Sequence, residues 1–233
     1  MTEPISLAYE TRGVSAAPDV PPLLLLHGNG EDRTYFKFQL AEFSASRRVI
    51  AVDTRGHGES PRGNAPFTLR QFAEDLRAFL DAHEIPRADL LGFSDGANVA
   101  LLFALKYPER VRKLVLNGPN LNGRGVRAIT QVPIVLGYRI ASLFANRSAR
   151  AKHNAELLNL MVNDPELPPE TLCKIRADTL VVAGTRDMIK ESHTRLIASK
   201  IPGAELAFLR GNHFVAAKNP EEFNRIVLSF LNR

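Results

Sequence analysis

Short, mostly apolar runs alternate along this chain with stretches of helical periodicity, and this alternation limits the possible folds more than any other feature. The runs lie at Leu23–Leu26, Arg48–Val52, Lys113–Gly118 and Thr179–Gly184. A strand that is apolar along its whole length is buried on both faces, which is typical of a parallel sheet covered by helices. We therefore expect an α/β fold, with a mostly parallel central sheet and helices on both faces.

The segments between these runs predict the other elements. Between Thr68 and His83, apolar residues recur at i, i+4, i+7 and i+8, so they share one face of a helix. Alternating apolar and polar residues over Ile5–Glu10 predict a half-exposed strand at the sheet edge. The remaining predictions are a strand at 88–91, helices at 98–105 and near 191–201, a strand at 204–209 and a helix at 221–231.

Residues 120–175 break the alternation. They contain no strand-like run, but Val135–Phe144 and Ala155–Val162 have a helical pattern. A connection of that length with helices of its own predicts a small helical lid inserted over the ends of the strands. We therefore expect a core formed by residues 1–119 and 176–233, with the lid between them.

The composition narrows the class of protein. Hydrophobic residues make up 45% of the chain and charged residues 24%, as in ordinary globular proteins. No apolar run approaches the ~20 residues that cross a bilayer, and no basic region followed by an apolar one opens the chain. The single cysteine, Cys173, excludes an internal disulfide. We expect a cytoplasmic protein without stable membrane insertion, and its oligomeric state stays open.

The net charge of +5 raises the question of nucleic-acid binding. Most cations are interspersed with acids and form no basic stripe with aromatics, so we expect no nucleic-acid partner. One stretch, from Asn120 to Ala155, holds basic residues and no acid. It is either a solubilising face or a site for an anionic group of a substrate. Its cations are Arg124, Arg127, Arg139, Arg147, Arg150 and Lys152.

Polar clusters follow the predicted strands at their carboxyl ends. They lie at 27–30, 53–60 and 94–95, and include Asp187 and His213. In open α/β sheets, ligands bind beyond the carboxyl ends of the strands. These clusters are therefore predicted to meet at one edge of the sheet and to form the functional site.

One of the clusters has the pattern Gly-x-Ser-x-Gly over residues 92–96, with Ser94 at its centre. A strand-like run precedes it and a helix-like run follows, so Ser94 is expected on a sharp strand-to-helix turn. The two glycines leave room for a strained backbone and for close packing of strand and helix. The first N–H groups of the helix favour negative charge beside the serine. The motif predicts a nucleophile.

A serine hydroxyl becomes a strong nucleophile only when a base accepts its proton. Of the six histidines, His213 follows the last predicted strand and precedes the last helix, which is the position expected for that base. His83 lies on a helix face and is expected to be structural. His153 and His193 lie in polar helical segments and are expected to be solvated.

The base needs a third group that holds it in the correct tautomer. Two strands follow the helix after Ser94. The first ends at Asn117–Asn120 without an acid, and the second ends at Gly184–Asp187 with one. We therefore assign this role to Asp187, because Asp178 precedes the same strand and belongs at the opposite end of the sheet.

The oxyanion of an acyl-transfer intermediate needs hydrogen-bond donors. We expect the backbone N–H of Asp95, directly after the nucleophile, to be one donor. The backbone N–H of Asn29, in the Gly-flanked loop after the first buried strand, is expected to be the other. The carboxylate of Asp95 would oppose a nearby oxyanion, so we expect it to turn outward or to cap the helix.

Five motifs together resemble the α/β-hydrolase fold family in order and spacing, over nearly the whole chain: His27–Gly30, Asp53–Ser60, Gly92–Gly96, Gly184–Asp187 and Gly211–Phe214. The resemblance implies a serine–histidine–aspartate triad and an oxyanion hole at the positions assigned above, with no cofactor and no metal. It also implies that the second motif is a structural turn. Relatives that dehalogenate or open epoxides have aspartate in place of the serine, which argues against those reactions.

We therefore expect a serine hydrolase that cleaves a small ester or related acyl compound through an acyl-enzyme, with a small-molecule substrate as its partner. The same triad also serves hydrolysis of carbon–carbon bonds, lactones or amides, and perhydrolysis, and these alternatives stay open. A third alternative is a ligand-binding protein that has this fold without turnover. The sequence leaves the physiological substrate, its acyl length and its leaving group open.

Overall fold

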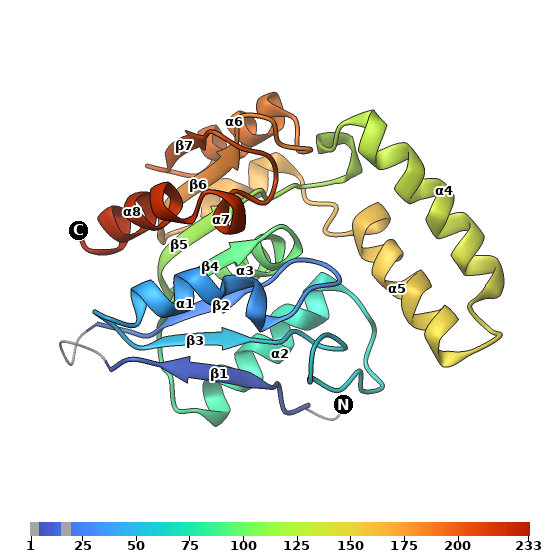
Figure 1. Ribbon diagram of the computed structural model, residues 1–233, viewed down its shortest axis with the longest axis horizontal. Coiled ribbons are helices and arrows are strands. Elements are labelled where there is room, and N and C mark those ends of the chain that lie inside the picture. Colours follow the sequence, from blue (N-terminus) through green and yellow to red (C-terminus); the bar gives the residue numbers. More distant parts are fainter. Residues whose placement is uncertain (1–4, 15–19) are drawn as a thin grey trace.

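Seven strands form one sheet in the order β1-β3-β2-β4-β5-β6-β7 (Figure 1). The computed structural model describes residues 5–14 and 20–233, so residues 1–4, on which the expectation about a leader rests, lie outside the described part. β1 runs antiparallel to β3, and all other neighbours are parallel. This confirms the predicted fold class. The strands are β1 (Tyr9–Arg12), β2 (Leu23–Leu26), β3 (Val49–Val52), β4 (Ala88–Phe93), β5 (Val111–Asn117), β6 (Asp178–Gly184) and β7 (Glu205–Leu209).

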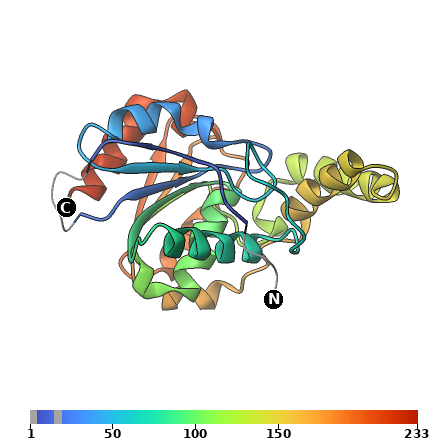
Figure 2. The ribbon, with the colours of Figure 1, turned by 90° about the horizontal axis from the view of Figure 1, so that it is seen from below.

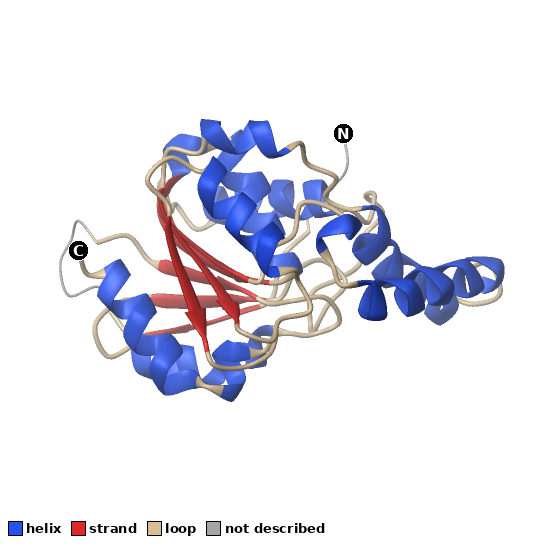
Figure 3. Ribbon diagram, turned by 90° about the horizontal axis from the view of Figure 1, so that it is seen from above, coloured by secondary structure: helices blue, strands red, loops and turns tan. Residues whose placement is uncertain are grey.

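Helices cover both faces of the sheet, as Figure 3 shows. Side chains alternate along a strand, so Leu24 and Leu26 of β2 enter one apolar cluster while Leu23 and Leu25 enter the other. The first cluster lies under α2 (Leu69–Ala82), α3 (Asp95–Lys106) and α6 (Glu191–Lys200). The second lies under α1 (Lys37–Phe43), α7 (Val215–Lys218) and α8 (Pro220–Leu231). The two clusters form the core that fixes the strand ends in place.

α2 shows how the sequence determines one of these helices. Its apolar residues Phe72, Leu76 and Phe79 lie on one face and are buried against the sheet. Thr68 precedes the helix with extended backbone, and its side chain accepts a hydrogen bond from the N–H of Gln71. This cap satisfies one of the free donors of the first turn, so the helix begins where the sequence predicts.

Two long helices, α4 (Ala128–Phe144) and α5 (Ala149–Asn163), lie between β5 and β6 and extend beyond the carboxyl ends of the strands (Figures 1 and 2). We call α4, α5 and the turn between them the helical arm. Figure 1 shows α5 between α4 and the core. The division into a core and a lid at residues 120–175 stays a prediction. Short 3-10 helices complete the fold at Arg33–Phe36 (η1), Pro108–Arg110 (η2), Gly123–Gly125 (η3) and Pro169–Lys174 (η4).

Both junctions of this region are held by the core. Before the arm, Val126 forms an isolated bridge with Ile189, and the N–H of Arg127 donates to the carbonyl of Met188. After it, Leu172 of η4 is fully buried in the cluster under α6. Among residues 5–14 and 20–233, no helix is both long and apolar enough to cross a bilayer.

Candidate active site

Ser94 lies at the turn between β4 and α3 with a backbone that non-glycine residues rarely adopt. Its φ is 52° and its ψ −119°, a strained conformation that lifts the side chain off the sheet. The two flanking glycines make this turn possible. A Cβ on Gly92 would lie 2.3 Å from the carbonyl oxygen of Gly96, and one on Gly96 would lie 2.0 Å from that of Leu26. Strand and helix therefore approach as closely as the motif predicts.

The loop after β7 brings His213 between the other two residues predicted for the triad. Its Nε2 lies 3.0 Å from Oγ of Ser94, and its Nδ1 lies 2.7 Å from Oδ1 of Asp187. His213 and Asp187 are each 3% exposed, whereas Ser94 is half-buried. Three residues that are far apart in the sequence are thus joined in one hydrogen-bonded line.

The environment of Asp187 defines the direction of these hydrogen bonds. Its Oδ1 also accepts from the N–H of Ile189 at 2.9 Å, and its Oδ2 accepts from the N–H of Gly184 at 3.3 Å. An ionised carboxylate only accepts hydrogen bonds, so Nδ1 of His213 donates to it. Nε2 is then free to accept the hydroxyl proton of Ser94. This is the tautomer that a general base requires.

Packing holds the imidazole of His213 in this position. The rings of Phe93 and Phe214 lie 4.9 Å and 5.6 Å from it, centre to centre. Tyr35 stacks on the opposite side of Phe93 at 4.4 Å. The imidazole has little room to turn, so its hydrogen bonds to the serine and the aspartate are preorganised.

The side chain of Asp95 was predicted to turn outward or to cap the helix. It is buried, and within the described residues its hydrogen-bond donors are side-chain amides rather than backbone N–H groups of α3. Its Oδ2 accepts a hydrogen bond from Nδ2 of Asn29 at 2.9 Å, and its Oδ1 accepts one from Nδ2 of Asn98 at 3.4 Å. The same amide of Asn29 also donates to the carbonyl of Leu157 in α5 at 2.9 Å. The loop after β2, the turn at Ser94 and the helical arm are thus linked through one side chain.

Burial raises the pKa of Asp95 to about 6 from its ordinary 3.8, although its hydrogen bonds to Asn29 and Asn98 oppose the shift. Between these two pH values the folded protein keeps a proton that the unfolded chain releases, so its stability falls as the pH rises. We expect Asp95→Asn to remove this dependence. The advantage of the variant in unfolding free energy should grow by up to about 3 kcal/mol from pH 4 to pH 6, then stay level.

Urea unfolding of parent and variant across that range measures the difference. The matched control is Glu84→Gln, which makes the same change from a carboxyl to an amide at an exposed position. The difference in unfolding free energy between Asp95→Asn and the parent must change with pH. A constant difference would contradict a buried carboxyl with a raised pKa.

The cavity beside Ser94 is small and is closed by the helical arm. Asn29 and Asp95 border it from the core, and Gln131, Ile134 and Met161 border it from α4 and α5. It holds about 20 Å³, which is room for about one water molecule. While α4 and α5 lie where they do, this space is therefore too small for an acyl group.

A wider groove of about 380 Å³ reaches the other side of His213. Arg127, Thr130, Arg186 and Asn212 border it. Nε of Arg127 donates to the backbone carbonyl of Asp187 at 2.8 Å, which places that guanidinium beside the triad. In the sequence, Arg127 is only one member of a basic stretch. Its contact with Asp187 is not visible there, because Asp187 lies sixty residues further along the chain.

The remaining histidines of this edge are structural. Nε2 of His27 accepts from the N–H of Thr54 at 3.0 Å, so its Nδ1 carries the proton and donates to the carbonyl of Gly28. Burial lowers the pKa of both His27 and His57, that of His57 to about 4. His57 belongs to the motif that the family resemblance assigned to a structural turn.

Two further histidines were predicted to be solvated, and the structure places both at half-buried positions. His193 is half-buried, and its Nε2 accepts from the N–H of Leu121 at 3.0 Å. His153 is half-buried against the ring of Phe67, 5.8 Å away. In each case the partner comes from a distant segment, which helical periodicity alone does not reveal.

Glu31 is a residue of this site that sequence analysis missed. It is half-buried, and its Oε2 accepts from the N–H of Gly28 at 3.3 Å. Burial raises its pKa to about 7, while His213 and the hydrogen bond from Gly28 lower it. A carboxyl that titrates near neutrality thus lies within electrostatic range of the imidazole. Its place five residues after the first buried strand was the available signal.

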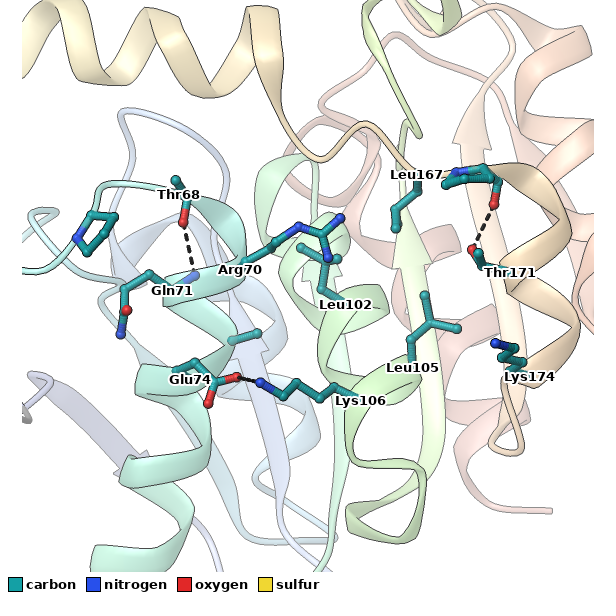
Figure 4. A pocket seen from close by; sticks show the side chains of 13 residues that line it. Thr68, Arg70, Gln71, Glu74, Leu102, Leu105, Lys106, Leu167, Thr171 and Lys174 are labelled. Carbon is teal, nitrogen blue, oxygen red and sulfur yellow. Dashed lines mark hydrogen bonds and ion pairs between the residues drawn. The ribbon is translucent and has the colours of Figure 1, made fainter. Parts of the chain in front are cut away.

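A larger groove, of about 540 Å³, lies elsewhere, between α2, α3 and η4 (Figure 4). Leu102, Leu105 and Leu167 point into it, and the ion pair of Glu74 with Lys106, at 2.8 Å, crosses its rim. Its lining includes no serine, cysteine or histidine. In the described part of the chain, no three His, Cys, Asp or Glu side chains gather as a metal site.

Comparison with known proteins agrees with this architecture. A family model described as the alpha/beta hydrolase fold matches residues 21–135. The crystal structure of a hydrolase from Pseudomonas aeruginosa is 30% identical, covers 98% of this chain and 95% of its own, and superposes with a TM-score of 0.79. The chain belongs to the α/β-hydrolase fold family.

Two further proteins are similar to this chain. The mouse (Mus musculus) serine hydrolase BPHL is 28% identical over 234 residues, covering 90% of this chain and 78% of its own. The enol-lactonase from Burkholderia xenovorans is 22% identical, covers 98% of this chain and 97% of its own, and superposes with a TM-score of 0.81. At that identity the lactonase supports the fold alone.

Proposed function

We propose that this protein is a serine hydrolase that cleaves a small ester or related acyl compound through an acyl-enzyme intermediate. The observation that carries the proposal is the hydrogen-bonded line from Ser94 through His213 to Asp187, with distances of 3.0 Å and 2.7 Å. Membership of the α/β-hydrolase fold family and the likeness to the mouse serine hydrolase support it.

In the proposed reaction, Oγ of Ser94 attacks the acyl carbon while Nε2 of His213 takes the hydroxyl proton. The backbone N–H groups of Asn29 and Asp95 are proposed to hold the oxyanion of the tetrahedral intermediate. His213 returns its proton to the leaving oxygen, and the alcohol departs. Water then attacks the acyl-enzyme with the same histidine as base, which releases the acid and restores the serine.

The carboxylate of Asp187 stabilises the imidazolium that forms in both halves of this cycle. Its two backbone hydrogen bonds, from Ile189 and Gly184, keep it fixed and leave Oδ1 in line with the imidazole. We also propose that residues 120–175 act as a lid, because α4 and α5 border the small cavity beside Ser94. Opening of this lid is then part of substrate entry.

A second candidate is an anionic acyl substrate, including a lactone or a diketone cleaved at a carbon–carbon bond. The groove beside His213 favours it, because Arg127 and Arg186 border that groove. A carboxylate on the substrate would find two guanidinium groups there. The bond cleaved and the charge of the substrate are separate questions, so a substrate panel must vary both.

Labelling with a fluorophosphonate tests the proposed nucleophile. We expect one equivalent to bind, with the modified peptide carrying Ser94, and p-nitrophenyl acetate to give a burst of one equivalent of nitrophenol. His213→Gln should slow labelling by about a hundredfold or more, since the base is lost. His83→Gln is the matched control at the end of α2 and should label like the parent. An unlabelled parent would exclude the proposed chemistry.

A further inference from the structure

α4 carries apolar side chains on two opposite faces, and only one of them has a partner. Its inner residues Gln131 and Ile134 border the cavity beside Ser94, and α4 packs along α5. No residue of α4 is buried. The outer face presents a continuous row of exposed side chains at helical spacing, which we call the outer stripe: Ile129, Val132, Leu136, Ile140, Leu143 and Phe144.

The exposure of this stripe is large for apolar side chains. Ile129 is 84% exposed, Leu143 79% and Leu136 58%. Single exposed apolar residues are common on protein surfaces, but a contiguous row of this kind marks an interaction site. Ile129, at one end of the stripe, also borders the groove beside His213, whereas the cavity beside Ser94 is bordered by the opposite face of the helix. A lid closed over an apolar pocket therefore does not explain it.

The charges around the stripe indicate what covers it. From Asn120 to Ala155 the chain has no Asp or Glu, and its cations lie at both ends of α4 and beside the stripe. In the described part of the chain, none of these cations forms an ion pair with an acid. The cations are Arg124, Arg127, Arg139, Arg147, Arg150 and Lys152.

This charge pattern disfavours a second copy of the chain as the partner. Two outer stripes in contact would bring Arg139 of each copy into one interface, with no acid on α4 to pair with either. A surface of anionic lipids can bind both the apolar stripe and the cations beside it. The stripe can enter the boundary between headgroups and acyl chains, while the arginines bind lipid phosphates.

The position of α4 makes such contact possible for the intact protein. Figures 1 and 2 show the helical arm extending away from the sheet, with α4 on its outer side. α4 is 17 residues long and ends in arginine-bearing turns, so it can lie in the plane of a membrane surface without crossing it. We propose that the outer stripe docks this protein on anionic lipid membranes as a peripheral, reversible contact.

Vesicle flotation of the full chain tests this proposal. We expect the protein to float with phosphatidylcholine vesicles that contain about one-third phosphatidylglycerol, and not with pure phosphatidylcholine vesicles. Binding should weaken strongly when salt is raised to about 1 M, since the attraction between cations and phosphates is screened. Equal binding to both kinds of vesicle would overturn the role of the cations.

Substitutions in the stripe test whether the stripe, rather than the rest of the surface, makes the membrane contact. Leu136→Glu with Ile140→Glu should reduce the partition coefficient by about tenfold or more, because the stripe can no longer enter the interface. Val14→Glu is the matched control, an exposed apolar residue away from the arm (81% exposed), and should bind like the parent. Thermal melting must be the same for all three. Binding of the double variant like that of the parent would overturn the proposal.

A second pair of variants tests the charges. Arg139→Gln with Arg147→Gln should lower binding to the anionic vesicles by about fivefold for each cation removed. Arg210→Gln with Arg225→Gln removes two exposed arginines elsewhere and should have little effect on vesicle binding.

Sedimentation of the parent tests whether a second copy of the chain covers the stripe instead. A dimer that the Leu136→Glu, Ile140→Glu variant dissociates, together with no vesicle binding by the parent, would replace the membrane with a second copy.

Discussion

Ser94→Ala is expected to lower kcat for hydrolysis of p-nitrophenyl acetate by about 10⁵-fold or more, with the fold and thermal melting retained. The methyl group has no atom that can form the acyl-enzyme, and the imidazole of His213 loses the hydroxyl that lies 3.0 Å away. Steady-state kinetics and fluorophosphonate labelling measure the loss. The variant should show neither turnover by the triad nor a labelled peptide.

Ser44→Ala serves as the matched control. Ser44 is a half-buried serine at the end of α1, away from Ser94, and its hydroxyl donates to the carbonyl of Ala41. Its removal should leave kcat unchanged. Retention of more than about 1% of the parent's activity by Ser94→Ala would mean that another group is the nucleophile.

Asp187→Asn should be the second most damaging change, with kcat lower by about 10⁴-fold. The parent carboxylate accepts from His213, Ile189 and Gly184 at once. An amide has one accepting oxygen, so its NH₂ group must face one of these donors. If it faces His213, the imidazole moves its proton to Nε2 and can no longer accept the hydroxyl proton of Ser94.

The same substitution at the opposite end of β6 gives the control. Asp178 is the exposed first residue of that strand, and Asp178→Asn should leave kcat near the parent's value. Both variants should melt within a few degrees of the parent. Activity of Asp187→Asn within about tenfold of the parent would show that this carboxylate does not orient the base.

The sequence predicted most of the sheet because the strands are buried on both faces. The apolar runs of β2, β3 and β6 identify these strands, since a strand that lies inside two helix layers must be apolar at every position. β1 was predicted at Ile5–Glu10 but is observed at Tyr9–Arg12. Its side chains are mostly exposed, so its limits depend on backbone pairing with β3, which an alternating pattern does not define.

α4 begins at Ala128, seven residues before the predicted helical stretch. Pro133 is the reason, because a proline inside a helix removes a backbone donor and normally ends the pattern. Here Pro133 is exposed, so the carbonyl without its helical partner can be hydrated. The helix also lies outside the core. The sequence pattern of α4 therefore does not distinguish the face that borders the cavity from the face that carries the outer stripe.

The residues that line up around Ser94 were predictable because each follows a strand at the same edge of the sheet. Their roles in catalysis stay proposals. The network around Asp95 was not predictable, since Asn29 lies sixty-six residues away and its amide also bonds to α5. Polar contacts between distant segments depend on how the layers pack, and no local pattern encodes them.

The two hydrogen bonds donated by the Asn29 amide have a consequence for how this chain could change its substrate range. One joins the loop beside the nucleophile to Asp95, and the other joins it to the carbonyl of Leu157. Any rearrangement of α5 that withdraws this carbonyl leaves the amide with one acceptor instead of two. Exchanging the arm for that of another hydrolase would then alter selectivity and intrinsic reactivity together, so the two properties cannot be evolved as separate modules.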